Sequence, residues 1–137
     1  MSDPALASYY QHRMTTAYQE QIWAVTIVGA MNAFIASHAG ALVRSFPLWQ
    51  LLAGVSLAAL GALGMVLSRH VIFVYHDEEA RLLLAVPPMR STHVFGERRG
   101  LWRWLARWSG VVFYSLIIFV LWGIAWRLLT AASRSGT

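Results

Sequence analysis

The sequence predicts an all-α integral membrane protein with three transmembrane helices, cytoplasmic helical extensions and an interfacial amphipathic helix. Apolar residues make up 58% of the 137 residues and charged residues only 12%, whereas soluble domains carry about 25% charged residues. The charges are also clustered, which leaves three stretches without any, at 21–43, 45–68 and 108–126. Because a bilayer core of roughly 30 Å requires about 20 apolar residues in a helix, all three stretches are long enough to cross it, the third only just.

The first predicted element is a helix that starts at Pro4, because Ser2-Asp3-Pro4 combines a capping residue with a proline at the first helical position. Helical spacing of apolar residues continues to about Ser37, and a short loop then leads to a second helix near Pro47. The flanking charges place the first two transmembrane segments at about 22–43 and 47–68. A cleavable signal peptide is a weaker reading of the first segment, since the residues before it do not form a short basic region.

A cytoplasmic segment, 69–98, follows the second transmembrane helix. The helix is expected to continue beyond Ser68, with a possible restart at Asp77, and to end before a loop at 87–96. The polar extensions of the first two helices emerge on the same side, so we expect them to pack as an antiparallel stalk. The side chains expected to meet there are Tyr10, Met14 and Tyr18 from the first helix, with Val71, Tyr75 and Leu82 from the second.

An interfacial amphipathic helix is predicted at 99–107, directly before the third transmembrane segment at about 108–127. Arginines recur every four residues on one face, and tryptophan and leucine occupy another face that runs into the transmembrane segment. Tryptophan and arginine both favour the headgroup region, so continuity with a spanning helix favours membrane anchoring over a site for a partner protein or a nucleic acid. The candidate membrane-interface residues are Arg99, Trp102, Arg103, Trp104, Arg107 and Trp108.

The distribution of arginine predicts the orientation. Residues 69–107 contain seven arginines and the N-terminal segment contains Arg13, whereas the opposite side has only Arg44, Arg127 and Arg134. The positive-inside rule therefore places the N-terminus in the cytoplasm and the C-terminus in the periplasm of a cell with an inner membrane. This layout resembles that of small bacterial membrane proteins, including small membrane effectors of defence systems. The resemblance is one of layout and involves no motif residue.

Small residues share a face on each of the first two predicted helices. On the first helix, the small residues of this face are Gly29, Ala33, Ala36, Ser37 and Gly40. On the second helix, they are Gly54, Ala58, Gly61 and Ala62. Such faces let helices approach closely in lipid, and two interpretations stay open: packing of the hairpin within one chain, or homo-oligomerisation. Asn32 lies near the membrane midplane, with Ser56 and Ser115 at similar depth. We expect Asn32 to form an interhelical hydrogen bond, or to line the lumen of an oligomeric pore.

No feature of the sequence indicates catalysis. The chain has no cysteine, its three uncharged stretches contain no Asp, Glu, Lys or Arg, and no catalytic motif is present. His38 and His70 are about a membrane thickness apart in depth and are not expected to clamp one haem, so no cofactor or metal is predicted. The sequence favours a non-enzymatic inner-membrane protein, either an accessory subunit or a self-associating module. Its expected partners are the lipid bilayer and either further copies of the same chain or a larger membrane complex. Binding to nucleic acid is not expected. The alternatives are an oligomeric pore or membrane-disrupting effector, and a haem-binding anchor subunit.

Overall fold

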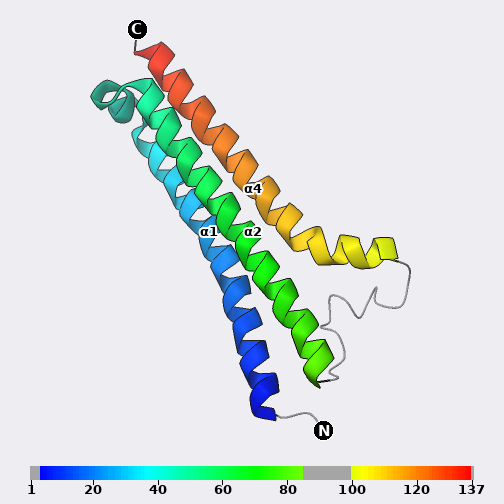
Figure 1. Cartoon of the computed structure of the whole chain (residues 1–137). Coiled ribbons are helices and arrows are strands. Elements are labelled where there is room, and N and C mark those ends of the chain that lie inside the picture. The colour runs from blue at the N-terminus through cyan, green and yellow to red at the C-terminus, as the bar shows by residue number, and fades with distance from the viewer. Residues whose placement is uncertain (1–3, 85–99, 137) are drawn as a thin grey trace.

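The described part of the chain forms three long helices (Figure 1). The computed structural model describes residues 4–84 and 100–136, without the side chains of Leu6, Asp77, 79–84 and 100–107. The helices are α1 (Pro4–Ser45), α2 (Leu48–Leu84) and α4 (Gly100–Ser135). Each contains a segment long and apolar enough to cross a membrane: Ala7–Ser45, Leu48–His76 and Trp108–Ser135. The predicted all-α fold with three such helices is therefore confirmed for the described residues.

Helices α1 and α2 form an antiparallel hairpin joined through Phe46 and Pro47. The Pro47 carbonyl accepts hydrogen bonds from the backbone N–H groups of Gln50 (3.0 Å) and Leu51 (3.3 Å), which starts α2. The predicted loop at 37–47 is wrong for most of its length, since α1 continues to Ser45. No proline interrupts the chain between Pro4 and Pro47, so helical hydrogen bonding continues until proline removes a donor. The predicted restart at Asp77 is also not seen, because α2 runs through it.

Helix α4 packs against both α1 and α2 and runs parallel to α1 (Figure 1). The sequence predicted an interfacial helix at 99–107 that runs into the third transmembrane segment, and the structure has one continuous helix from Gly100 to Ser135. Its first part, yellow in Figure 1, turns sideways from the rest of the bundle. The sequence in this region contains the pair Ser109-Gly110, and Gly/Ser pairs are frequent sites of helix kinks.

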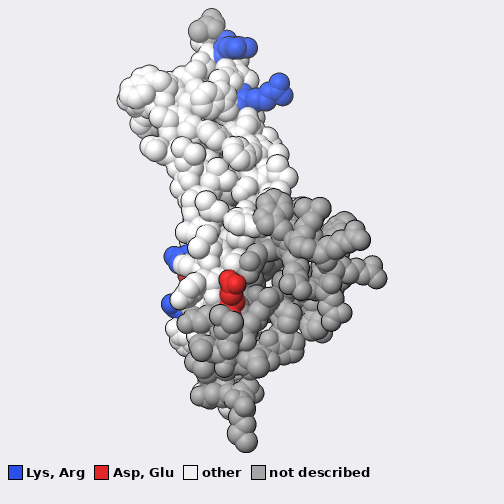
Figure 2. All heavy atoms as spheres, turned by 45° about the vertical axis from the view of Figure 1, so that its right-hand side comes forward, with Lys and Arg blue, Asp and Glu red and all other residues white. Residues whose placement is uncertain are grey.

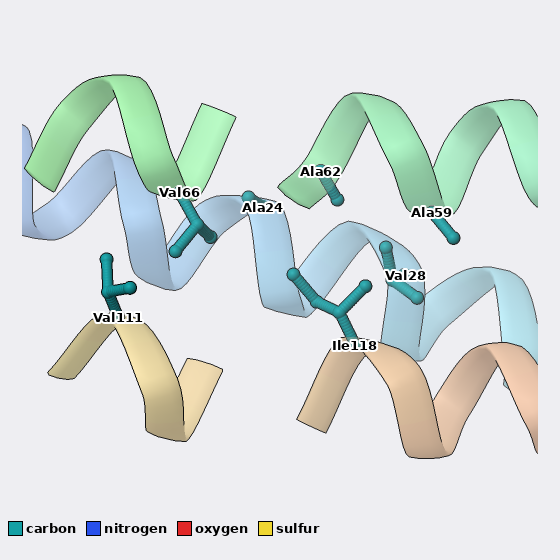
Figure 3. Packing of buried hydrophobic residues seen from close by; sticks show 7 residues of the cluster. All are labelled: Ala24, Val28, Ala59, Ala62, Val66, Val111 and Ile118. Atoms are coloured by element: carbon teal, nitrogen blue, oxygen red, sulfur yellow. The ribbon is translucent and has the colours of Figure 1, made fainter. Parts of the chain in front are cut away.

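The core residues recur three or four positions apart on α1 and α2 and four or seven positions apart on α4, which is the pattern of coiled-coil packing. The buried residues are Tyr10, Met14, Ala17, Gln21, Ala24, Val28, Asn32 and Ile35 on α1; Val55, Ala59, Ala62, Val66 and His70 on α2; and Val111, Ile118, Ala125 and Leu129 on α4. Figure 3 shows how Ala24, Val28, Ala59, Ala62, Val66, Val111 and Ile118 from the three helices meet in the larger cluster. Alanines at these positions let the helix backbones approach one another closely.

The outer surface of the bundle is apolar between two charged ends. Figure 2 shows on one face that charged side chains lie toward the ends and that an uncharged belt separates them. On α1 the belt extends from Glu20 to Arg44, which is roughly 36 Å at about 1.5 Å per residue, close to the bilayer core of roughly 30 Å. Large side chains in this belt are exposed, with Leu57 at 70% and Trp23 at 64%. The described helices are thus compatible with a multi-pass membrane protein.

Candidate functional site

A polar layer joins α1 to α2 at the end of the bundle that contains the N-terminus. Gln21 is 5% exposed, and its Nε2 donates a 3.0 Å hydrogen bond to the carbonyl oxygen of Val66. Next to it, Nε of Arg69 lies 2.5 Å from Oε2 of Glu20. The ion pair is more than one-third exposed on the arginine side and contributes little to stability, whereas buried interhelical hydrogen bonds in membranes contribute about 0.6–2 kcal/mol. Gln21, which the sequence analysis did not single out, is therefore the stronger determinant of the α1–α2 register.

Aromatic contacts connect α4 to this layer. The buried His70 ring lies 4.9 Å from the ring of Trp108, centroid to centroid. Tyr18 of α1 meets Tyr114 of α4 edge to face, with 6.3 Å between the ring centroids. Trp108 is partly buried against the larger core cluster. The start of the third candidate membrane span is thus held against both other helices.

Of the side chains predicted to meet beyond the membrane segments, Tyr10 and Met14 are buried. Tyr10 lies against His76, with 5.8 Å between the ring centroids. Tyr18 meets Tyr114 of α4, and both Val71 and Tyr75 are more than half exposed. The side chain of Leu82 lies outside the described residues.

Asn32 is buried inside the bundle, at 7% exposed. Its Nδ2 donates to the carbonyl oxygen of Val28, one turn earlier in the same helix, at 3.1 Å. Among the described residues, no donor bonds its Oδ1. The predicted interhelical hydrogen bond of Asn32 is therefore not what the structure has. Depth along the helix is readable from the sequence, but the partner depends on how the three helices are rotated about their axes.

The two buried amides should respond differently to replacement by leucine. We expect Asn32→Leu to leave stability unchanged or to raise it by about 1 kcal/mol, because it removes a buried acceptor without a partner. In contrast, Gln21→Leu should lower stability by about 1 kcal/mol through loss of the bond to Val66. Unfolding in mixed micelles, followed by circular dichroism, measures both changes. A larger loss for Asn32→Leu than for Gln21→Leu would show that Asn32 has a donor partner from another helix.

A second interhelical hydrogen bond lies at the other half of the bundle. Nε1 of Trp122 donates to Oγ of Ser56 at 3.2 Å. Ser56, which was predicted to lie at a depth similar to that of Asn32, accepts this bond. Ser115, the other serine predicted at this depth, is half-buried.

The predicted small-residue faces lie on the outside of the bundle. Ala33, Gly54, Ala58 and Gly61 are exposed and Gly29 is half-buried. A Cβ atom added at Gly29, Gly40, Gly54 or Gly61 would meet no other atom within 4 Å. Ala62 is the one member of the two predicted faces that belongs to the larger core cluster. The helices of one chain thus pack through other residues and leave these faces accessible.

For most of the predicted membrane-interface residues, the structure does not describe the side chain. Arg99 is not described, and for Trp102, Arg103, Trp104 and Arg107 only the helical backbone of α4 is described. Trp108 is described, and it packs inward on His70.

The histidines lie at different ends of the bundle. His38 is exposed on α1 near the connection to α2, where its Nδ1 lies 3.0 Å from the carbonyl oxygen of Phe34. His70 is near the opposite end. Among the side chains that the structure describes, no three of His, Asp or Glu gather in a way that would hold a metal ion.

The chain was compared with known protein families, with characterised proteins and with solved structures. None matches. The function therefore has to be argued from the bundle itself.

Proposed function

We propose that this chain is a small non-enzymatic inner-membrane protein whose three helices cross the bilayer and which acts by self-association. Insertion is supported by the apolar belt between the charged ends of the bundle. The observation that carries self-association is the small-residue face of α1, made of the half-buried Gly29 and the exposed Ala33, Ala36, Ser37 and Gly40.

This face has the properties of a helix-packing surface in lipid. Lipid tails are as apolar as leucine, so helices associate there through close van der Waals packing, which small residues permit. The face spans twelve residues, and its two ends are roughly 16 Å apart along the helix. Open space surrounds Gly29 and Gly40, and the intramolecular core uses Ala24 and Val28 instead. A second copy can therefore dock on α1 without disturbing the fold of either chain.

Cysteine cross-linking in membranes tests this proposal directly, because the chain contains no cysteine of its own. We expect Ala33→Cys, on the α1 face, to form a disulfide-linked dimer under mild oxidation. The matched control is Ala53→Cys, an alanine on α2 that is also exposed, which should remain monomeric. Equal cross-linking of the two variants would contradict association through α1. A heavier hetero-product from Ala33→Cys alone would instead identify an accessory subunit of a larger complex.

The proposed orientation has the N-terminus in the cytoplasm and the C-terminus in the periplasm. Alkaline phosphatase, which is active only in the periplasm, should therefore be active when fused after residue 137 and inactive when fused before residue 4. The physical basis is the excess of arginine in residues 69–107. The reverse activity pattern would overturn this orientation without affecting the cross-linking result.

The alternative of a pore lined by Asn32 has less support. Asn32 is buried among the three helices of one chain, whereas the lumen of an oligomeric pore would lie between chains. The placement of this amide therefore favours a structural position within the bundle.

A further inference from the structure

Helix α4 carries a groove of about 180 Å³ on its outer surface, in the half of the bundle near the C-terminus. Phe119, Trp122, Gly123 and Trp126 line it. A Cβ atom at Gly123 would meet nothing within 4 Å, so the absence of a side chain there keeps the groove open. The rings of Phe119 and Trp122 stack with centroids 6.0 Å apart and planes 23° apart, which gives the groove a flat aromatic wall.

This wall is fixed in place by the rest of the bundle. Trp122 donates its indole N–H to Ser56 of α2 and packs against both core clusters. Phe119 and Trp126, in contrast, are 53% and 42% exposed and face outward. A groove with a preformed wall binds a flexible ligand with a smaller entropic cost of ordering the protein.

A basic residue lies at one end of the groove. Arg127 is four residues after Gly123 and eight after Phe119, so these three residues share one face of the helix. Arg127 is exposed, and among the described residues no carboxylate lies within ion-pair distance of it. Arg44 and Arg134 lie toward the same end of the bundle. The face thus passes from a cation at the expected headgroup level to an apolar groove at greater depth.

We propose that this face binds one phospholipid, with its phosphate on Arg127 and one acyl chain in the Phe119–Trp126 groove. The guanidinium group is suited to phosphate oxygens, and the distance from Arg127 to Phe119, roughly 12 Å along the axis, matches a headgroup and the upper part of an acyl chain. A side chain from a packing helix would fit the apolar groove but would leave the cation without a counter-charge. The inference rests on the proposed membrane insertion and is independent of the α1 face.

Native mass spectrometry of the full chain in mild detergent, titrated with dioleoyl phosphatidylglycerol, tests the site. Gly123→Leu fills the groove and Arg127→Gln removes the cation, and each should raise the apparent Kd of the first bound lipid at least tenfold. The matched controls are Gly64→Leu, an exposed glycine of α2 that also has open space around it, and Arg44→Gln at the same end of the bundle. Both controls should bind lipid as the wild type does.

Three other outcomes would overturn the proposal. If Gly123→Leu binds the first lipid like the wild type, the groove is not the site. If Arg44→Gln weakens binding as much as Arg127→Gln, the lipid is held by diffuse charge. If Gly123→Leu changes only cross-linking between chains, the groove takes a helix instead. The helical signal in circular dichroism verifies that each variant folds. Membrane fractionation tests the proposed insertion, and Ala33→Cys cross-linking tests the proposed self-association, so a failure of the proposed function is seen separately.

Discussion

Leu57→Arg is expected to disfavour membrane insertion of α2 by about 3 kcal/mol, from the difference between leucine and arginine at the centre of a transmembrane helix. Leu57 is 70% exposed and lies thirteen residues after Arg44 and twelve before Arg69. It is therefore near the middle of the apolar belt, where an arginine side chain is farthest from both headgroup regions. Insertion is measured as the fraction of chains whose engineered glycosylation sites report a membrane-spanning α2.

The same substitution separates a membrane protein from a soluble bundle. In water, an exposed leucine replaced by arginine changes stability by only about 0.5 kcal/mol or less. The control is Val71→Arg, which is also exposed, at 55%, but lies beyond Arg69. Its arginine reaches the headgroup region, so insertion should match the wild type. Normal insertion of Leu57→Arg would remove the basis for lipid as the solvent of the belt.

The number and approximate positions of the helices were predictable because charge is excluded from three stretches of suitable length. The sequence does not reveal which face of each helix points toward the core. In a soluble bundle the core face is apolar and the outer face polar, so periodicity reveals rotation about the axis. Here Val28 in the core and Ile27 on the surface are chemically alike, and the pattern carries little information on orientation.

The candidate site residues illustrate the same limit. Small residues on α1 and α2 were recognisable as packing surfaces, but the choice between intramolecular and intermolecular packing depends on which face the third helix covers. Gln21 and Trp122 were overlooked for related reasons. Gln21 borders a charged residue and resembles a residue of the membrane boundary, and Trp122 is one of several large aromatic residues in the third uncharged stretch. Their hydrogen bonds are long-range contacts that no local pattern encodes.

Two interhelical hydrogen bonds thus set the relative position of helices whose apolar surfaces are largely interchangeable, and a partly exposed ion pair adds a small contribution. Gln21 with Val66 and Glu20 with Arg69 act at one end, and Trp122 with Ser56 acts nearer the other. Apolar packing between α1 and α2 would permit sliding by one turn at little cost in contact area. The polar pairs remove this ambiguity, because a shifted register would leave buried donors without acceptors.

Packing in the core supplies most of the free energy of association of the three helices, and Ile118→Ala is expected to reveal it. Ile118 is fully buried in the larger core cluster, where it meets residues of both other helices (Figure 3). Its truncation should lower stability by about 2–5 kcal/mol, since dispersion contacts are lost and a cavity remains.

The matched control for this prediction is Leu116→Ala, which removes as many carbon atoms from a side chain that is 59% exposed, two residues earlier in the same helix. Lipid chains can fill the space left at the surface, whereas nothing fills the space in the core. Steric trapping in bilayers or unfolding in mixed micelles should therefore show a large loss for Ile118→Ala and a small one for Leu116→Ala. Equal losses would mean that α4 is rotated from the position described, with Leu116 as buried as Ile118.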